Sequence, residues 1–117
     1  MEPVIIFAGT TEGRELSEYL SAQKIQVTAC VATEYGETIL RGKQYLNIHT
    51  GRMDAAQMKA FLQKTGAGLV VDATHPYAAV VSQNVAQACR ETKTEYLRLI
   101  RESQQMETKE AVLVSSV

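Results

Sequence analysis

The chain of 117 residues has no tryptophan, only two cysteines, and no excess of charge of either sign. It has 12 basic and 13 acidic residues, and the basic ones form no cluster. This argues against a surface that binds nucleic acid or anionic membranes. No apolar run approaches the roughly 20 residues that span a bilayer. The opening MEPVIIFAGT also lacks the basic residues of a signal peptide. Together these absences favour a cytoplasmic protein.

The two cysteines, Cys30 and Cys89, both lie inside segments of regular hydrophobic periodicity. We interpret them as buried thiols in a reducing cytosol rather than as a disulfide or a metal pair. Neither of the two histidines, His49 and His75, keeps a metal-like spacing to a cysteine or a carboxylate. The sequence therefore predicts no metal site.

Short apolar segments alternate with segments of helical periodicity along the chain. Strands are predicted at 4–8, 25–32, 45–49, 69–73 and 96–100, and helices at 11–23, 54–64 and 76–92, with a further helical turn near 38–40. Such alternation gives right-handed crossovers and a parallel sheet. The predicted fold is α/β: a Rossmann-like, doubly wound parallel sheet of about five strands, in the order 3-2-1-4-5, with helices on both faces.

Two helices carry recognisable end signals. Asp54 is expected to cap the second long helix, and Gly66 to end it. Pro76 is expected to be the first residue of the third, because proline suits that position. The predicted buried stripe of this third helix consists of Ala78, Val81, Val85 and Cys89.

The chain is predicted to hold one complete domain, residues 1–102. The segment 103–117 is polar until the apolar run 111–114. We interpret it as a linker or as the first strand of a further domain.

In a sheet of this order, ligands bind outside the carboxyl ends of the first and fourth strands, where the strand order reverses. The first strand is followed there by Gly9–Arg14. Gly9 allows a tight turn, the positive end of the following helix suits a phosphate, and Gly13 would keep the approach open. The alternative is an ordinary strand-to-helix turn, capped by Thr10 or Thr11, with Glu12 in the first turn. The candidate cofactor-binding residues are Gly9, Thr10, Thr11, Glu12, Gly13 and Arg14, with Thr33 and Glu34 after the second strand.

The preference between NADH and NADPH stays open. Glu34 lies near the position where an acidic residue holds the ribose 2′-hydroxyl of NADH. Thr33 beside it could meet a 2′-phosphate, and Arg41 or Lys43 could do the same.

The fourth strand is followed by DATHPYA, which holds Asp72, Thr74, His75 and Tyr77 within six residues. This set could supply a general acid, hydroxyl donors and anion contacts at the open end of the sheet. Asp72 is expected chiefly to hold the turn, while the other three face the cleft. Alternatively, Asp72 merely braces neighbouring loops, and His75-Pro76 forms an N-terminal cap.

Five segments in this order resemble one family. They are GTTEGREL near the N-terminus, Tyr35-Gly36, Gly51-Arg52, DATHPYA and YLRLIR, and together they are similar to the precorrin-6A reductases of cobalamin biosynthesis. That family includes forms that act on the metal-free and on the cobalt-bound substrate. Its members are longer, with a second Rossmann-like domain that encloses the cleft, so this chain looks like their amino-terminal domain.

The resemblance implies reduction of one double bond of a ring-contracted tetrapyrrole, with hydride from NADPH or NADH and a proton on the adjacent carbon. Asp72 to Tyr77 match the segment of the family that lines the cleft, and the candidate catalytic residues are His75, Tyr77 and Asp72. His75 is preferred as proton donor over Tyr77 or water, because it lies just before the predicted helix and its imidazole can reach the open crevice. Tyr77 could instead stack on the flat macrocycle. The implied substrate-binding residues are Tyr35, Gly36, Arg52, Thr74, Arg98 and Arg101. The arginines suit a substrate rich in carboxylates, although solvated strand ends and a loop charge are the alternative.

Two other functions compete with this one. A short-chain-type oxidoreductase would normally show Tyr-x-x-x-Lys, and none of the five tyrosines has lysine four residues later. A non-catalytic nucleotide- or tetrapyrrole-binding domain stays open. The implied partners are the tetrapyrrole and a carboxy-terminal domain, without which the isolated chain is expected to be inactive.

Overall fold

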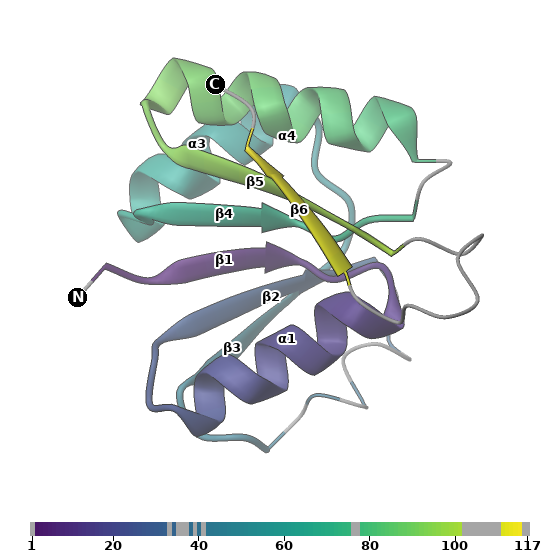
Figure 1. Cartoon of the computed structure of the whole chain (residues 1–117). Coiled ribbons are helices and arrows are strands. Elements are labelled where there is room, and N and C mark those ends of the chain that lie inside the picture. The colour runs from purple at the N-terminus through teal and green to yellow at the C-terminus, as the bar shows by residue number, and fades with distance from the viewer. Residues whose placement is uncertain are drawn as a thin grey trace.

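The computed structural model describes residues 2–32, 34, 38, 40, 42–75, 78–101 and 111–115, which form a six-stranded sheet with helices on both faces (Figure 1). The strands are β1 (Val4–Phe7), β2 (Val27–Val31), β3 (Leu46–Thr50), β4 (Leu69–Asp72), β5 (Glu95–Arg101) and β6 (Ala111–Ser115). The helices are α1 (Thr11–Ala22), α3 (Ala55–Thr65) and α4 (Ala79–Thr92). Of the helical turn predicted near 38–40, Ile39 lies outside the described residues.

The strand order is β3-β2-β1-β4-β5-β6. The first five strands are parallel, which confirms the predicted order 3-2-1-4-5. The sixth, β6, pairs antiparallel with β5. The apolar run predicted near the end of the sequence is therefore paired within this sheet. The assignment of 103–117 to a linker or to a further domain stays a prediction.

The core consists of two layers because successive side chains of a strand point to opposite faces. On β1, Ile5 and Phe7 pack with residues of α3 and α4, whereas Ile6 packs in the other layer with side chains of α1. Figure 1 shows the same arrangement, with α1 on one side of the sheet and α3 and α4 on the other. The doubly wound prediction is confirmed.

The ends of α3 are those predicted. The Asp54 carboxylate accepts the Gln57 N–H at 2.8 Å, and the Gln57 side chain accepts the Asp54 N–H at 2.8 Å. This reciprocal pair is a capping box. Gly66 ends the helix with φ +67°, a left-handed conformation that favours glycine.

The predicted start of α4 is wrong. The helix begins at Ala79, and the Ala78 N–H just before it donates to the His75 carbonyl at 2.8 Å. Pro76 itself lies outside the described residues. Of the predicted stripe, Val85 and Cys89 are buried, but Val81 is 36% exposed. Val81 lies in the first turn of α4 beside Val80, which is 69% exposed, so this turn presents an apolar surface to solvent.

Cys30 and Cys89 are buried in the layer between the sheet and α3 and α4, as predicted. Burial raises the pKa of both thiols to about 12. Within the described ranges, none of the helices has the length and apolar character needed to cross a membrane.

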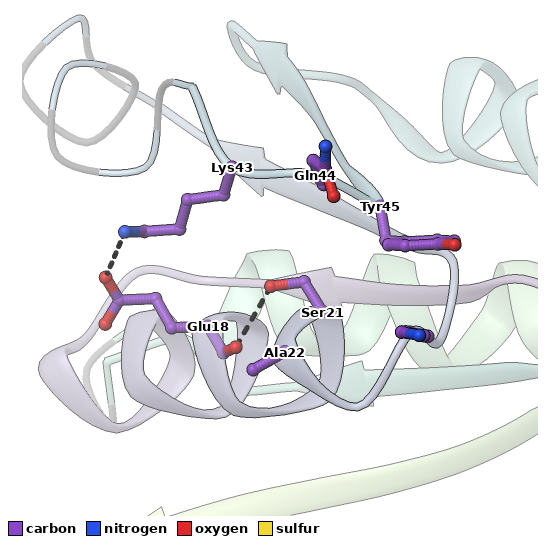
Figure 2. A pocket seen from close by; sticks show the side chains of 7 residues that line it. Glu18, Ser21, Ala22, Lys43, Gln44 and Tyr45 are labelled. Carbon is purple, nitrogen blue, oxygen red and sulfur yellow. Dashed lines mark hydrogen bonds and ion pairs between the residues drawn. The ribbon is translucent and has the colours of Figure 1, made fainter.

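A pocket of about 510 Å³ lies beside the last turns of α1 and the segment that leads into β3 (Figure 2). Glu18 and Lys43 form an ion pair at 3.2 Å across it, with both side chains about two-fifths exposed. An exposed pair of this kind contributes little to binding or stability. The pocket lies at the amino ends of the strands, and parallel sheets of this type bind ligands at the carboxyl ends. We therefore place the candidate site elsewhere.

Candidate functional site

Two loops meet at the carboxyl edge of the sheet, after β1 and after β4. These neighbouring strands pair directly, and the strand order reverses between them. The loops are close enough that a Cβ placed on Gly9 would lie 3.4 Å from the Thr74 Cα and 3.7 Å from the His75 nitrogen. The prediction that both sequence motifs lie at one edge is confirmed.

Thr10 joins the two loops. Its hydroxyl donates to the Ala73 carbonyl at 2.8 Å and accepts the Gly13 N–H at 3.2 Å, as the N-cap of α1. A threonine hydroxyl has one proton, and here Ala73 receives it. Thr10 therefore acts as the cap, the alternative stated for this turn, and is not a hydroxyl donor to a phosphate.

Gly13 is buried, and the reason expected for its glycine is wrong. A Cβ at this position would lie 2.9 Å from the Ala8 Cα and 2.9 Å from the Ala73 Cβ. The missing side chain lets α1 approach the ends of β1 and β4. The space that glycine leaves open is therefore filled by the protein and does not face a ligand.

The exposed part of this first motif is the outer side of the first turn of α1. Gly9 and Thr11 are exposed, and the Arg14 guanidinium donates to the Thr11 hydroxyl at 3.2 Å. The N-terminal end of the helix carries a partial positive charge, to which Arg14 adds a full one. Glu12, half-buried in the same turn, supplies a negative charge.

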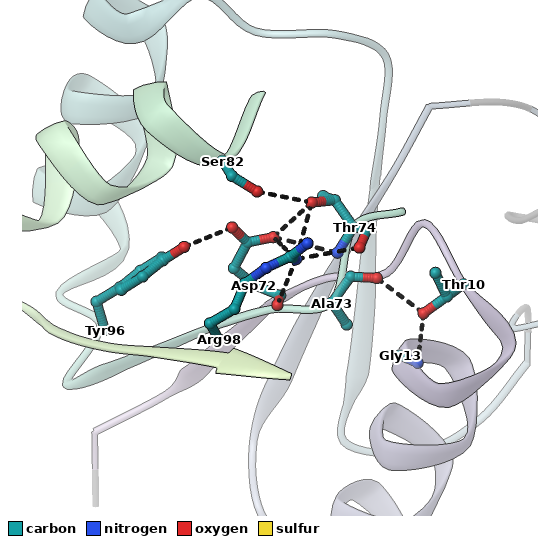
Figure 3. Close-up of polar contacts among 8 residues, drawn as sticks. All are labelled: Thr10, Gly13, Asp72, Ala73, Thr74, Ser82, Tyr96 and Arg98. Atoms are coloured by element: carbon teal, nitrogen blue, oxygen red, sulfur yellow. Dashed lines mark hydrogen bonds and ion pairs between the residues drawn. The ribbon is translucent and has the colours of Figure 1, made fainter. Parts of the chain in front are cut away.

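The second motif is organised around Asp72, the last residue of β4 (Figure 3). Its side chain is 0% exposed. Oδ2 accepts the Tyr96 hydroxyl at 2.6 Å, and Oδ1 accepts the Thr74 hydroxyl at 2.7 Å and the Thr74 N–H at 3.1 Å. The Arg98 Nη1 lies 3.0 Å from Oδ1 in an ion pair. Asp72 thus holds the turn, in agreement with the bracing role expected for it.

The surroundings of Asp72 favour the ionised form of its carboxyl group. Burial alone would raise the pKa of this carboxyl group, but the hydrogen bonds from Tyr96, Thr74 and Ser82 outweigh burial and hold the pKa below its ordinary value. Burial and the bond to Asp72 raise the pKa of Tyr96. At neutral pH the pair is therefore a charged carboxylate that accepts a hydrogen bond from a neutral phenol.

Arg98 is turned inward rather than towards the open edge. Its side chain is 15% exposed, and Nη1 also donates to the Asp72 carbonyl at 3.1 Å and to the Thr74 carbonyl at 3.0 Å. These contacts commit Nη1 to the loop after β4. His75, which follows Thr74, is exposed at the open edge.

The other predicted site residues are less closely grouped. Arg52 is exposed just after β3, beside the end of β2, because the Gly51 N–H donates to the Val31 carbonyl at 2.9 Å. Glu34 is exposed, and its carbonyl accepts the Thr38 hydroxyl at 2.9 Å. Arg101 ends β5 opposite Ala111. The predicted residues Thr33, Tyr35, Gly36, Pro76 and Tyr77 lie outside the described part of the chain.

Sequence reasoning missed Ser82 and Tyr96. Tyr96 and Arg98 are two residues apart on β5, and the register places Arg98 opposite Asp72. A buried carboxylate needs such partners, so the predicted strand order would have pointed to them. Ser82 lies in the first turns of α4, with its hydroxyl 3.1 Å from that of Thr74. No group of three or more histidine, cysteine or acidic side chains suited to a metal occurs among the described residues.

Comparison with known proteins gives one consistent family. Residues 3–117 match the family described as "Precorrin-6x reductase CbiJ/CobK". The cobalt-precorrin-6A reductase of Methanothermobacter thermautotrophicus is 35% identical over 99 residues, which are 84% of this chain and 33% of that protein. The cobalt-precorrin-6A reductase of Salmonella typhimurium is 37% identical over 86 residues, 74% of this chain and 32% of that protein.

The fold has a solved counterpart in the same family. The structure described as "CobK precorrin-6A reductase" matches with a TM-score of 0.73 and 29% identity, over 87% of this chain and 38% of that one. The chain spans about a third of the length of the first two curated relatives.

Proposed function

The chain belongs to the precorrin-6x reductase family, and we propose that it forms the amino-terminal part of an oxidoreductase of cobalamin biosynthesis. The proposed reaction adds a hydride and a proton across one double bond of precorrin-6A or its cobalt-bound counterpart. The observation that carries this proposal is the meeting of the two loops at the switch point of the sheet, tied by the Thr10–Ala73 hydrogen bond. Binding at that point is typical of this fold.

For the hydride source we propose NADPH or NADH, whose reduced nicotinamide supplies the hydride when bound. The first turn of α1 suits the negative pyrophosphate, because it combines the helix N-terminus with Arg14 and the Thr11 hydroxyl. Gly9 is exposed beside it and permits a close approach of the backbone. Glu34, exposed after β2, favours a ribose 2′-hydroxyl and hence NADH.

For the tetrapyrrole we propose the open surface beyond the loop after β4. Exposed Arg52 can pair with substrate carboxylates. Val80 and Val81 offer an apolar contact to a flat macrocycle. His75 is the proposed proton donor, because an imidazole can donate near neutral pH. Arg98, by contrast, we assign to Asp72 and the loop.

The proposed reaction also needs a second side to the active site. Hydride transfer needs the two reactants about 3–3.5 Å apart with water largely excluded. One sheet with its loops offers one side of such a site. We therefore propose that a further domain closes it, as the greater length of the relatives suggests.

The direct test is to titrate NADPH, NADH and a precorrin against two proteins. One is this chain, and the other is the extended protein, meaning this chain continued to the length of its relatives. We expect dinucleotide binding by both, followed in fluorescence, and reduction of precorrin by the extended protein alone. Reduction by this chain at a comparable rate would disprove the need for a second side to the active site. Binding without reduction by the extended protein would favour the alternative, a non-catalytic binding domain.

Replacing His75 by alanine in the extended protein tests the proton donor. We expect kcat to fall about a hundredfold, the low end for loss of a general acid, because water can replace it in part. The matched control is His49→Ala, since its ring lies 5.1 Å from that of Phe61 and its strand, β3, pairs with neither β1 nor β4. Unchanged kcat with a raised KM would make His75 a binding group instead.

A further inference from the structure

Five side chains from three elements converge behind the loop that follows β4 (Figure 3). We call this set the clamp; its members are Asp72, Thr74, Ser82, Tyr96 and Arg98. They come from β4 and its loop, from α4 and from β5. No buried side-chain nitrogen or oxygen lacks a partner within the described ranges, so the buried polar atoms of this set are satisfied.

The direction of each hydrogen bond in the clamp can be assigned. The Thr74 hydroxyl has one proton, and the 2.7 Å contact to the Asp72 carboxylate takes it, because a carboxylate can only accept. Arg98 can only donate, so the Thr74 oxygen accepts from its Nη1 at 3.1 Å. In the 3.1 Å contact between Thr74 and Ser82, the donor is therefore Ser82, whose hydroxyl also helps to hold the pKa of Asp72 down.

The resulting order ties the first turns of α4 to the end of β4. Ser82 donates to Thr74, Thr74 donates to Asp72, and Tyr96 donates to Asp72 from β5. The backbone of the loop is held as well, since the Thr74 N–H is bound by Asp72 and the Thr74 carbonyl by Arg98. Gly9 also lies close to this backbone, since a Cβ placed on it would be 3.4 Å from the Thr74 Cα and 3.7 Å from the His75 nitrogen. The backbone and the hydroxyl of Thr74 are therefore both held in place by hydrogen bonds.

The charge pair inside the clamp is better explained by orientation than by stability. A buried ion pair can often be replaced by apolar residues with no loss of stability, because two charges must be desolvated. Here the pair lies at the edge where both loops meet, directly before exposed His75. A site residue on a loop needs such support to be held within a fraction of an ångström.

We propose that Ser82, Tyr96 and Arg98 are positioning residues which act through Asp72 and Thr74 to fix the backbone that carries His75. This inference rests on the proposed function for its catalytic consequence. Its physical content, that Ser82 restrains the loop, does not depend on any substrate.

The first measurement is amide hydrogen exchange on the 117-residue chain, with Ser82→Ala as the variant. Ser82 is half-buried, and the variant removes one hydroxyl and leaves the Asp72 ion pair in place. We expect exchange of the Thr74 amide to become about tenfold faster, the effect of one lost hydrogen bond of ordinary strength. Exchange at Val70 and Val71, within β4, should stay unchanged. Unchanged exchange at Thr74 would overturn the inference.

The matched control is Thr94→Val. Thr94 shares a hydroxyl hydrogen bond of 2.7 Å with Thr92 in the connection between α4 and β5, at the end of the sheet opposite to Thr74. Loss of this hydrogen bond should leave the exchange rate of the Thr74 amide unchanged. Equal acceleration of Thr74 in this control would show that any lost bond loosens the loop, and the inference would fail.

The second measurement is steady-state kinetics of the same variants in the extended protein. Ser82→Ala should lower kcat about tenfold and change KM less than threefold, since a small misplacement of a reacting group slows the chemical step. Ser82→Thr keeps the hydroxyl and should restore kcat, whereas Thr94→Val should not change it. Full kcat in Ser82→Ala would overturn the positioning role.

The two proposals fail separately. An extended protein that reduces no precorrin with either dinucleotide would overturn the proposed function. The exchange result needs no substrate, so it would still support or overturn the action of Ser82 on the loop.

Discussion

Replacing Gly13 by valine is expected to lower the free energy of unfolding by about 3 kcal/mol, the upper range for overpacking a core. The nearest atoms to the new Cβ would be the Ala8 Cα and the Ala73 Cβ, both at 2.9 Å. The first belongs to the backbone of the segment after β1 and cannot turn aside. To make room, α1 has to move away from the sheet, which also strains the Thr10 cap and its bond to Ala73.

The measurement is urea unfolding of the 117-residue chain, followed by circular dichroism. Gly9→Ala is the matched control, because its Cβ would lie 3.4 Å from the Thr74 Cα, an ordinary contact. That variant should lose less than about 1 kcal/mol. A Gly13→Val chain that unfolds at the same urea concentration as the control would show that α1 has room to spare. The result also separates packing from binding, since no dinucleotide is present.

Much of the fold could be predicted because its signals are local. The apolar run of β1 and the alternation of strands and helices require only short windows of sequence. Asp54 and Gly66 mark the ends of α3 through contacts made within one turn of the helix. The rules of chain connection then predict a parallel sheet with right-handed crossovers. The order 3-2-1-4-5 is chosen by analogy with a Rossmann-like half.

The start of α4 could not be predicted in the same way. Pro76 is a good first residue of a helix, and nothing in its neighbourhood argues against that position. The structure instead begins the helix at Ala79, with the Ala78 N–H bonded to the His75 carbonyl and the Ser82 hydroxyl to that of Thr74. Because these contacts depend on where β4 ends in space, the local pattern favoured the wrong residue.

The candidate site shows the same limit. The sequence placed Gly9 and Asp72 at one edge, since that requires only the strand order. It did not distinguish a glycine that admits a ligand from one that admits another element, and Gly13 is the second kind. Tyr96 is 24 residues from Asp72 and joins it only through the register of β4 and β5.

Replacing Asp72 by alanine is expected to lower the free energy of unfolding by about 3 to 5 kcal/mol, the range for removing one partner of a buried ion pair. Arg98 is 15% exposed and would be left without its carboxylate. The Tyr96 hydroxyl and the Thr74 N–H would lose their acceptors as well. Asp72→Asn keeps the shape and one acceptor oxygen, so it should cost less. Urea unfolding at pH 7 of both variants and the parent chain measures these differences.

The pH dependence of the unfolding free energy shows whether the charge of Asp72 causes the loss of stability in Asp72→Ala. The pKa of Asp72 in the folded chain lies below its ordinary value of about 3.9. The stabilisation from its charge is therefore fully present above about pH 5 and is lost as the pH falls through the folded pKa. On acidification the parent chain should lose the stabilisation that the Asp72 charge provides. Asp72→Ala lacks this carboxyl group and cannot lose that stabilisation. The difference in unfolding free energy between the two chains should thus stay constant from pH 7 to about pH 5 and narrow below about pH 4. A difference that stays constant down to about pH 2 would mean that packing of the Asp72 side chain, rather than its charge, stabilises the loop after β4.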